Sequence, residues 1–287
     1  MILPRFDLLE PSSVKEVCQA LQTGSNARVI AGGTDLLVNL KKKVFSADIL
    51  VSLGKVSELK EMSFSDEKGL TLGSAVRIID MVDSPVINTN FPALTAAGAK
   101  LGSWQIRNRA TVGGNVCSAR PAADTIGPLI AYGATAVIAG PDGTREELIE
   151  TIYKGPGQTT LGKGEILQAI RIKKPSAGTR VSYSKYGTRQ AMEIAIVSAT
   201  VSVTIENGTC VDGKIVLGSV APTYIRCLKT EEFIKGKKIT EETAEQAGQI
   251  ASESCKPITD IRASADYRRQ LVKILVKRNL LNAVAGN

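Results

Sequence analysis

Two short segments of the sequence place a pair of adjacent glycines beside polar residues, a combination suited to binding an anionic group. The first is Ala31-Gly32-Gly33-Thr34-Asp35, and the second, 80 residues further along, is Thr111-Val112-Gly113-Gly114-Asn115. Glycine accepts positive φ angles and has no β-carbon, so the backbone N–H groups of such a segment can approach a ligand closely. Each segment is therefore a candidate cradle for a diphosphate.

The surroundings of the first segment favour this interpretation. Residues 27–31 have the pattern of a short buried strand, and an apolar helix begins at Leu36. The start of that helix adds free N–H donors and partial positive charge, and Thr34 adds a hydroxyl. The alternative is a tight strand-to-helix turn that binds nothing. The glycines do not match G-x-G-x-x-G, and residues 157–164 fail the P-loop pattern because Gly164 replaces the required Ser or Thr.

The second segment lies within residues 107–124, which show neither helical nor strand periodicity. Together the two segments predict a clamp between two subdomains, with one segment on each side of a diphosphate. Asn115 supplies amide donors and a carbonyl acceptor. Asp124 is a candidate acceptor for a ribose hydroxyl, as acidic residues are at other dinucleotide sites, or the N-cap of a helix over residues 124–132.

The composition excludes several kinds of catalytic site. The chain has no histidine, which removes Ser-His, Cys-His and His-metal schemes. Its five cysteines are scattered without a C-x-x-C pair, so we expect no disulfide framework, zinc site or iron–sulfur cluster. We therefore assign no catalytic and no metal-ligating residue to this chain.

The net charge of +8 raises the question of a nucleic-acid partner. Aromatic residues make up only 4% of the chain, and the basic residues are dispersed apart from Lys41-Lys42-Lys43 and a C-terminal helix. Stacking platforms are scarce, so we expect no nucleic acid but a solvated basic surface or a docking face for an acidic partner. No apolar run reaches the roughly 18 residues of a membrane span, and the N-terminus lacks a signal-peptide pattern, which predicts a cytoplasmic protein.

Hydrophobic periodicity predicts a mixture of helices and strands. A capping box at Ser13–Glu16 predicts the first helix, and Asn207-Gly208 predicts a tight hairpin. Linker composition at residues 173–178 predicts a boundary between a first domain of residues 1–175, with subdomains of about 1–55 and 56–175, and a smaller α+β domain of residues 179–287. The expected strands are 27–31, 48–53, 70–76, 134–139, 165–172, 180–186, 194–205 and 214–220, and the expected helices are 78–82, 91–101, 124–132, 240–254 and 264–281.

The two glycine segments and their flanks resemble the FAD-binding medium subunit of the molybdenum hydroxylases, the family that includes carbon monoxide dehydrogenase and xanthine dehydrogenase. The flanks are residues 105–109 before the second segment and residues 121–124 after it. Residues 218–223 and 260–269 are similar to the family's C-terminal domain, so the resemblance spans nearly the whole chain. It implies an α+β protein: a two-subdomain FAD-binding domain of the vanillyl-alcohol-oxidase (PCMH) type, followed by a smaller α+β C-terminal domain.

The resemblance also implies which residues contact FAD. Residues 29–36 and 111–115 would wrap the diphosphate and its neighbours, Asp124 would face the ribose or adenine, and Lys185 would lie near the flavin. The alternatives are an exposed strand residue for Lys185 and ordinary core packing for Leu101 and Leu167. The full predicted set is Val29, Ile30, Ala31, Gly32, Gly33, Thr34, Asp35, Leu36, Leu101, Thr111, Val112, Gly113, Gly114, Asn115, Asp124, Leu167 and Lys185.

The resemblance implies a subunit that transfers electrons. FAD would take electrons from [2Fe–2S] clusters on a small partner subunit and pass them to an external acceptor, which is NAD, a quinone, oxygen or a carrier. A large molybdopterin subunit would oxidise the substrate, and the complex is expected to be a dimer of heterotrimers. Because no histidine is present to carry a covalent link, noncovalent FAD is expected, and a link through Cys117 is disfavoured. Trp104 has no assigned role: core packing is the default expectation, and a position near the flavin or at a subunit face is the alternative.

Two other functions stay open at the level of sequence. One is a stand-alone FAD-dependent oxidoreductase of the same fold, and the other is a basic nucleic-acid-binding or carrier-binding module without a cofactor. The C-terminal helix is a candidate docking face for a partner subunit. Its basic residues and those just before it are Arg262, Arg268, Arg269, Lys273, Lys277 and Arg278.

Overall fold

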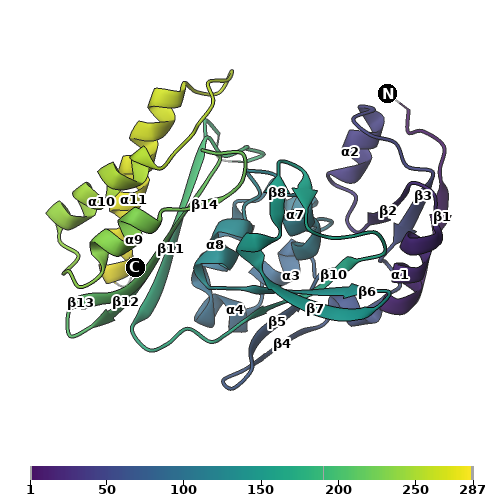
Figure 1. Ribbon diagram of the computed structural model, residues 1–287, viewed down its shortest axis with the longest axis horizontal. Helices are drawn as coiled ribbons and strands as arrows, with labels where there is room; N and C mark the ends of the chain where they lie inside the picture. The colour runs from purple at the N-terminus through teal and green to yellow at the C-terminus, as the bar shows by residue number, and fades with distance from the viewer. Residues whose placement is uncertain (1, 190, 286–287) are drawn as a thin grey trace.

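The computed structural model describes residues 2–189 and 191–285. The molecule is elongated, and its sheets follow one another along its length. Figure 1 shows a small N-terminal sheet at one end, a five-stranded sheet in the middle, and a four-stranded sheet with its helices at the other end. The protein is thus built of three successive parts.

The N-terminal part is a three-stranded parallel sheet with two helices. Its elements are β1 (Asp7–Leu9), α1 (Val14–Thr23), β2 (Ala27–Ile30), α2 (Leu36–Lys41) and β3 (Ile49–Ser52), and the strand order is β1-β3-β2. The predicted first helix is confirmed: the Ser13 side chain accepts from the Glu16 N–H, and the Glu16 carboxylate accepts from the Ser12 N–H. The return arm of the capping box therefore reaches the residue before the N-cap.

The middle part is a five-stranded antiparallel sheet covered by short helices. Its strands are β4 (Met62–Ser65), β5 (Gly69–Gly73), β6 (Thr135–Gly140), β7 (Gly143–Leu148) and β10 (Ile166–Ile172), in the order β4-β5-β10-β6-β7. Phe91, Leu94 and Leu129 are fully buried in its core. Around the sheet lie η1 (Ser57–Lys60), α3 (Ile78–Val82), α4 (Pro85–Asn90), α5 (Pro92–Ala99), α6 (Trp104–Arg107), α7 (Val112–Cys117), α8 (Ile126–Ala131), η2 (Ile149–Thr151), β8 (Tyr153–Gly155) and β9 (Gln158–Thr159).

The C-terminal part is a four-stranded antiparallel sheet with helices on one face. Its elements are β11 (Thr179–Tyr186), β12 (Val197–Glu206), β13 (Thr209–Gly218), β14 (Ile225–Arg226), α9 (Leu228–Ile234), α10 (Glu241–Glu253) and α11 (Ala265–Ala285). Asn207 and Gly208 both have positive φ, 49° and 76°, so the predicted tight turn between β12 and β13 is confirmed. Figure 1 shows α10 and α11 lying together over the sheet.

The C-terminal part packs directly on the middle part. Tyr183 of β11 is buried against Ala93 and Ala97 of α5. Elsewhere in the same interface, Arg226 Nη1 of β14 lies 3.3 Å from Glu150 Oε1 of η2. The two parts therefore share both an apolar contact and an ion pair.

Most predicted elements are present, but two features differ from the sequence expectation. β2 is an edge strand whose four residues are all half-buried, so the prediction of a buried strand is wrong. Residues 107–124 contain helix α7, which the periodicity did not indicate. Thr111 caps this helix by accepting from the Gly114 N–H at 3.0 Å, and a local cap of this kind stabilises a helix too short to show a periodic apolar stripe.

Candidate functional site

The two glycine segments lie against each other in the structure. A β-carbon on Gly32 would be 1.9 Å from the carbonyl oxygen of Arg109 and 3.0 Å from the Cα atom of Ala110. These two residues immediately precede Thr111, the start of the second segment. Only a residue without a side chain fits at position 32, and its absence of a β-carbon brings the two segments into contact.

The first segment carries a row of unused backbone donors. In the part of the chain that the structure describes, the N–H groups of residues 32–36 donate no hydrogen bond. Gly33 has a φ of 73°, so the chain turns there in the left-handed region that favours glycine. Backbone N–H groups that the protein leaves unpaired are satisfied by water or by a ligand. Five consecutive donors of this kind suit a group with several anionic oxygens.

The second segment differs, because the N–H groups of residues 112–115 already donate within the protein. The Val112 N–H donates to the Val76 carbonyl and the Gly113 N–H to the Ser74 carbonyl, each at 2.9 Å. A β-carbon on Gly113 would lie 2.6 Å from that Ser74 oxygen, so this glycine permits close packing of α7 on the chain after β5. Of the two pairs, only the first has its donors free, and the second fixes the wall beside it.

Asn115 fixes the start of α8. Its side-chain oxygen accepts from the backbone N–H of Thr125 at 3.1 Å and from the Thr125 hydroxyl at 2.6 Å. Its amide nitrogen donates to no residue among those described, so a ligand can use the amide donors predicted from the sequence. The oxygen acceptor is already occupied by Thr125.

Asp124 and Lys185 form a buried ion pair. Lys185 Nζ lies 2.9 Å from Asp124 Oδ1 and 3.1 Å from Oδ2, with side-chain exposures of 5% and 7%. The Tyr183 hydroxyl donates to Asp124 Oδ1 at 3.0 Å, and Lys185 also donates to the carbonyl of Lys100 at 3.1 Å. Burial raises the pKa of Asp124 above its ordinary value, and the ammonium group of Lys185 opposes that change.

These contacts overturn two of the sequence alternatives. Lys185 is not an exposed strand residue, since its side chain is buried in the contact between β11 and the middle part. Asp124 does not cap the following helix: the N-cap of α8 is Thr125, and no side chain caps it. The side chains of these two residues are in direct contact.

The apolar candidates lie in different environments. Leu101 and Leu167 are 7% and 3% exposed and belong to the core of the middle part. Trp104 is 60% exposed on α6, with the Arg107 guanidinium 5.8 Å from the centre of its ring, so the expectation of core packing is wrong for this residue.

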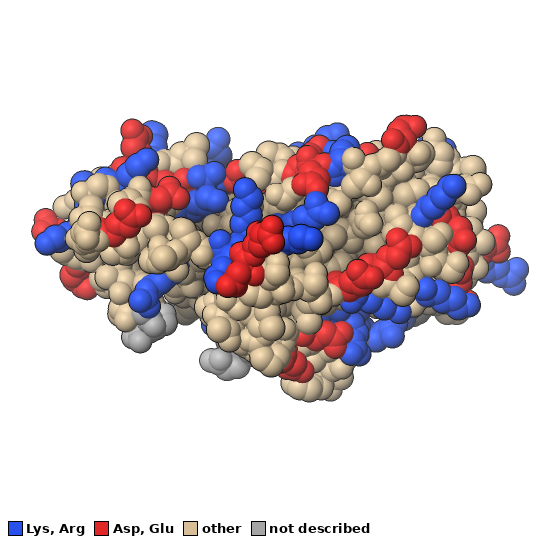
Figure 2. Space-filling model, turned by 90° about the horizontal axis from the view of Figure 1, so that it is seen from below, with Lys and Arg blue, Asp and Glu red and all other residues tan. Residues whose placement is uncertain are grey.

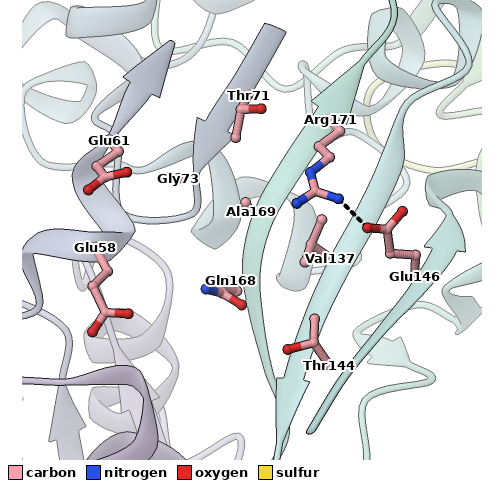
Figure 3. Close-up of a pocket in the computed structure, with 10 residues that line it drawn as sticks. All are labelled: Glu58, Glu61, Thr71, Gly73, Val137, Thr144, Glu146, Gln168, Ala169 and Arg171. Atoms are coloured by element: carbon pink, nitrogen blue, oxygen red, sulfur yellow. Dashed lines mark hydrogen bonds and ion pairs between the residues drawn. The ribbon is translucent and has the colours of Figure 1, made fainter. Parts of the chain in front are cut away.

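None of the predicted contact residues lines a cavity of about 460 Å³ beside the middle sheet. Figure 3 shows Glu58 and Glu61 on one side of it and the strand residues Thr71, Gln168 and Arg171 on the other. Arg171 is paired with Glu146 at its edge. Its carboxylates disfavour an anionic ligand, so this cavity is not the site predicted from the glycine segments.

The charged surface does not form one basic face. Figure 2 shows lysine and arginine interspersed with acidic residues on the side it presents. Arg268 is only 3% exposed: it donates to the carbonyls of Ile196 and Ser219 and pairs with Asp260 at 2.8 Å. The proposal that it belongs to a docking face is therefore wrong. Arg262, Arg269 and Lys277 are also paired with carboxylates of this chain.

The cysteines are not arranged for redox or metal chemistry. All five are free, and no cluster of potential metal ligands occurs in the described residues. Cys117 packs against the core, and desolvation raises the pKa of its thiol to about 12. A thiol with so high a pKa is a poor nucleophile at neutral pH. Among the described helices, none is long and apolar enough to span a bilayer.

Two residues of the site were missed from the sequence. Arg120 Nη2 lies 3.8 Å from Asp35 Oδ1 and 3.5 Å from Asn39 Oδ1, which connects α2 to the segment after α7. Tyr183 holds Asp124 from β11. Tyr183 and Lys185 are two residues apart on one strand, so their side chains lie on the same face. This spacing could have identified Tyr183 from the sequence once Lys185 was a candidate.

The comparisons with known proteins agree with this architecture. A family model described as the FAD binding domain in molybdopterin dehydrogenase matches residues 4–175, and one described as the CO dehydrogenase flavoprotein C-terminal domain matches residues 182–283. The carbon monoxide dehydrogenase medium chain of Hydrogenophaga pseudoflava is 31% identical and covers 98% of this chain and 97% of its own. A putative xanthine dehydrogenase FAD-binding subunit of Escherichia coli (strain K12) is 29% identical and covers 96% and 94%.

Solved structures show the same fold over the whole chain. The match to quinoline 2-oxidoreductase from Pseudomonas putida 86 has a TM-score of 0.94 and 32% identity, and covers 100% of this chain and 99% of that one. The match to carbon monoxide dehydrogenase from Hydrogenophaga pseudoflava has a TM-score of 0.95 and 31% identity with the same coverage. The chain belongs to the family of FAD-binding subunits of the molybdopterin dehydrogenases. The predictions of the fold, of FAD and of an oxidoreductase subunit are confirmed.

Proposed function

We propose that the chain holds FAD noncovalently across its two glycine segments and transfers electrons between a partner subunit and an external acceptor. The observation that carries the proposal is the row of unused N–H donors in residues 32–36, set against Arg109 and Ala110. When bound, FAD accepts electrons from one-electron donors and passes them on singly or in pairs. The chain's own task is to bind the cofactor, orient it and set the charge around it.

The residues present suit the parts of FAD. The N–H groups of residues 32–36 and the hydroxyl of Thr34 would bind the diphosphate, and the amide of Asn115 would donate from the opposite wall. Lys185 would place a positive charge beside the flavin, which favours electron density there. Apart from Asp124, which pairs with Lys185, the remaining predicted residues would supply apolar and van der Waals contact: Val29, Ile30, Ala31, Leu101, Leu167 and the backbone of 111–114. No step in this account needs a histidine or a reactive thiol.

The domain boundaries follow the same logic. We propose an FAD-binding domain of residues 1–175, with subdomains of about 1–55 and 56–175, and a C-terminal domain of residues 179–287. The change from the middle sheet, which ends with β10 at Ile172, to the C-terminal sheet, which begins with β11 at Thr179, supports this division. Lys185 would then reach the flavin from the C-terminal domain.

The relatives support a heteromeric complex. Several bear the names of medium chains or FAD-binding subunits, among them the medium chain of carbon monoxide dehydrogenase and the medium subunit of nicotine 6-hydroxylase. We propose that this chain likewise joins a large molybdopterin subunit and a small subunit with two [2Fe–2S] clusters, as a dimer of heterotrimers in the cytoplasm. The electron acceptor is NAD, a quinone, oxygen or a carrier protein.

The proposal is tested by purifying the protein from its native source under conditions that retain bound partner subunits. The expected result is a yellow complex that contains FAD, iron and molybdenum, in which substrate reduces the iron–sulfur clusters and the flavin together. A yellow monomer free of iron and molybdenum would instead support a stand-alone oxidoreductase. A colourless chain that binds no added FAD would contradict both readings.

A further inference from the structure

Arg120 reaches from the middle part of the molecule to the segment that carries the unused N–H donors. It lies between α7 and α8 in the chain, and its guanidinium group contacts α2, which Figure 1 shows on the side of the N-terminal part that faces the middle part. Nη2 lies 3.8 Å from Asp35 Oδ1 and 3.5 Å from Asn39 Oδ1. Arg120 therefore contacts the last residue of the first glycine segment.

The carboxylate of Asp35 opposes the binding of an anionic ligand unless a cation accompanies it. The backbone N–H of Asp35 is one of the five unused donors, so the negative charge of its side chain is covalently tied to the group proposed to bind the diphosphate. Like charges so close together repel each other and lower affinity. The Asp35 side chain makes no cap bond to α2, so the backbone of the helix does not hold this carboxylate.

Asn39 links the carboxylate to the guanidinium group. Its side-chain nitrogen donates to Asp35 Oδ2 at 2.8 Å, and its oxygen accepts from Arg120. Asn39 is 7% exposed and lies one turn along α2 from Asp35. Among the residues that the structure describes, no other lysine or arginine pairs with Asp35. The three side chains thus form a chain of contacts from α2 to the segment after α7.

From this geometry we propose that Arg120 is a positioning residue for the diphosphate site and acts through Asp35. The inference rests on the proposed function, because it concerns the same N–H donors. Arg120 offsets the negative charge of Asp35, and together with Asn39 it holds the carboxylate on α2. The five donors then meet the phosphates of FAD without an unpaired carboxylate beside them. Arg120 itself makes no contact with the cofactor in this account.

The pair should affect the ligand much more than the fold. The side chains of Arg120 and Asp35 are 45% and 53% exposed, and an exposed ion pair contributes little to the free energy of unfolding. The thermal midpoint of Arg120→Gln without FAD is therefore expected to stay within about 2 °C of the wild type. A fall of more than about 5 °C would show a structural role and contradict the inference.

FAD dissociation constants of the full-length chain, measured after removal of its flavin, test the proposal. Arg120→Gln is expected to raise the constant about fivefold at low ionic strength, because Asp35 is then unpaired. Adding Asp35→Asn to this variant is expected to restore the constant to within about twofold of the wild type, because the charge that Arg120 offsets is gone. Arg120→Lys keeps the positive charge and is expected to lose less than about twofold.

A direct contact between Arg120 and a phosphate would give a different pattern. The double variant would then bind FAD as weakly as Arg120→Gln alone, and this result would overturn the inference. Wild-type affinity in Arg120→Gln would overturn it as well. The same holds if Arg120→Lys binds as weakly as Arg120→Gln, because positive charge would then not be the property that matters.

Ionic strength provides a readout that a purely structural role of Arg120 would not change. The ratio of the Arg120→Gln and wild-type constants is expected to approach one as salt rises from about 0.01 M to about 1 M, because the Debye length falls from about 30 Å to about 3 Å. A ratio that is independent of salt would contradict the inference.

Lys42→Gln is the matched control, since it removes a positive charge from the exposed end of α2 and leaves the pair intact. We expect a change below about twofold at low salt. A loss equal to that of Arg120→Gln would show that net charge alone is responsible and would overturn the inference. A wild-type chain that binds no FAD would contradict the proposed function, whereas a chain that binds FAD but is not rescued by Asp35→Asn would contradict only this inference.

Discussion

Gly32 and Arg109 are in such close contact that a β-carbon at position 32 would lie 1.9 Å from the Arg109 carbonyl oxygen. This contact joins the segment with unused N–H donors to the wall formed by α7. The site therefore depends on a contact between two pieces of backbone. Glycine is required at position 32 because there is no room for a β-carbon there. Substitutions there should affect cofactor binding without removing any functional side chain.

Gly32→Ala should separate the two segments. Because the neighbouring atoms are backbone and cannot rotate away, we expect a loss of about 1–3 kcal/mol in the free energy of unfolding, with a marked loss of bound FAD. Absorbance at the flavin band and urea unfolding measure the two effects. Gly155→Ala is the matched control, since the nearest atom to its β-carbon would be 3.8 Å away. Equal FAD content in both variants would contradict the close-contact account.

Arg268 and its neighbour Arg269 should behave differently when each is replaced by glutamine. Arg268 is buried and bonded to two carbonyls and Asp260, so its loss should cost about 3–5 kcal/mol. Arg269 pairs with the exposed Asp266, and its loss should cost less than about 0.5 kcal/mol. Denaturant unfolding of the two variants checks this. Similar stabilities of the two variants would contradict the claim that the buried contacts of Arg268 stabilise the fold.

The fold was largely accessible from the sequence because its helices and long strands have clear periodic patterns. The Ser13 cap of α1 and the Asn207-Gly208 turn are examples in which local chemistry and final structure agree. The position of β2 was predicted correctly, but its burial was not. Burial depends on which strands flank it in the sheet, and the tertiary topology decides this. α7 was missed because its six residues include two glycines and its stability comes from the Thr111 cap and from packing on Ser74.

The site was accessible only in part. Sequence pattern identified both glycine segments, but it could not show that one leaves its donors free and the other uses them. Asp124 and Lys185 were each identified, yet their contact was not, because 61 residues separate them and only the packing of β11 brings them together. Arg268 illustrates the opposite error, since a charge on a helix is predicted to face solvent unless buried partners for it are known.

Acid should weaken the molecule through Glu165. Two hydrogen bonds from Arg145 and one from the Gly162 N–H hold the pKa of this carboxyl at about 2, below the 4.5 of the free group. A depressed folded-state pKa stabilises the protein above the unfolded value, and that stabilisation is lost as the pH falls from about 4.5 towards 2.

The substitution Glu165→Gln isolates this contribution. At pH 7 the variant should be less stable than the wild type by about 1–3 kcal/mol, and the difference should shrink as the pH approaches 3. Urea midpoints measured across this range provide the check. Glu67→Gln, at an exposed position, is the control and should show no such trend. A difference for Glu165→Gln that is independent of pH would show that shape and not charge is responsible.

FAD should be released intact when the protein is denatured by acid. Desolvation keeps the Cys117 thiol protonated, and the chain contains no histidine, so neither common route to a covalent flavin link is open. After precipitation with acid, the yellow colour should appear in the supernatant. Flavin fluorescence that remains with the protein pellet would show a covalent link, and its loss in Cys117→Ser would identify the attachment point.

The central claim is that the unused N–H groups of residues 32–36 bind FAD. Hydrogen–deuterium exchange of the deflavinated protein, with and without added FAD, tests it most directly. The account predicts that FAD slows exchange in the peptides covering residues 31–36 more strongly than in residues 112–115, whose donors are already bonded within the protein. Unchanged exchange in residues 31–36, with protection elsewhere in the chain, would contradict the claim.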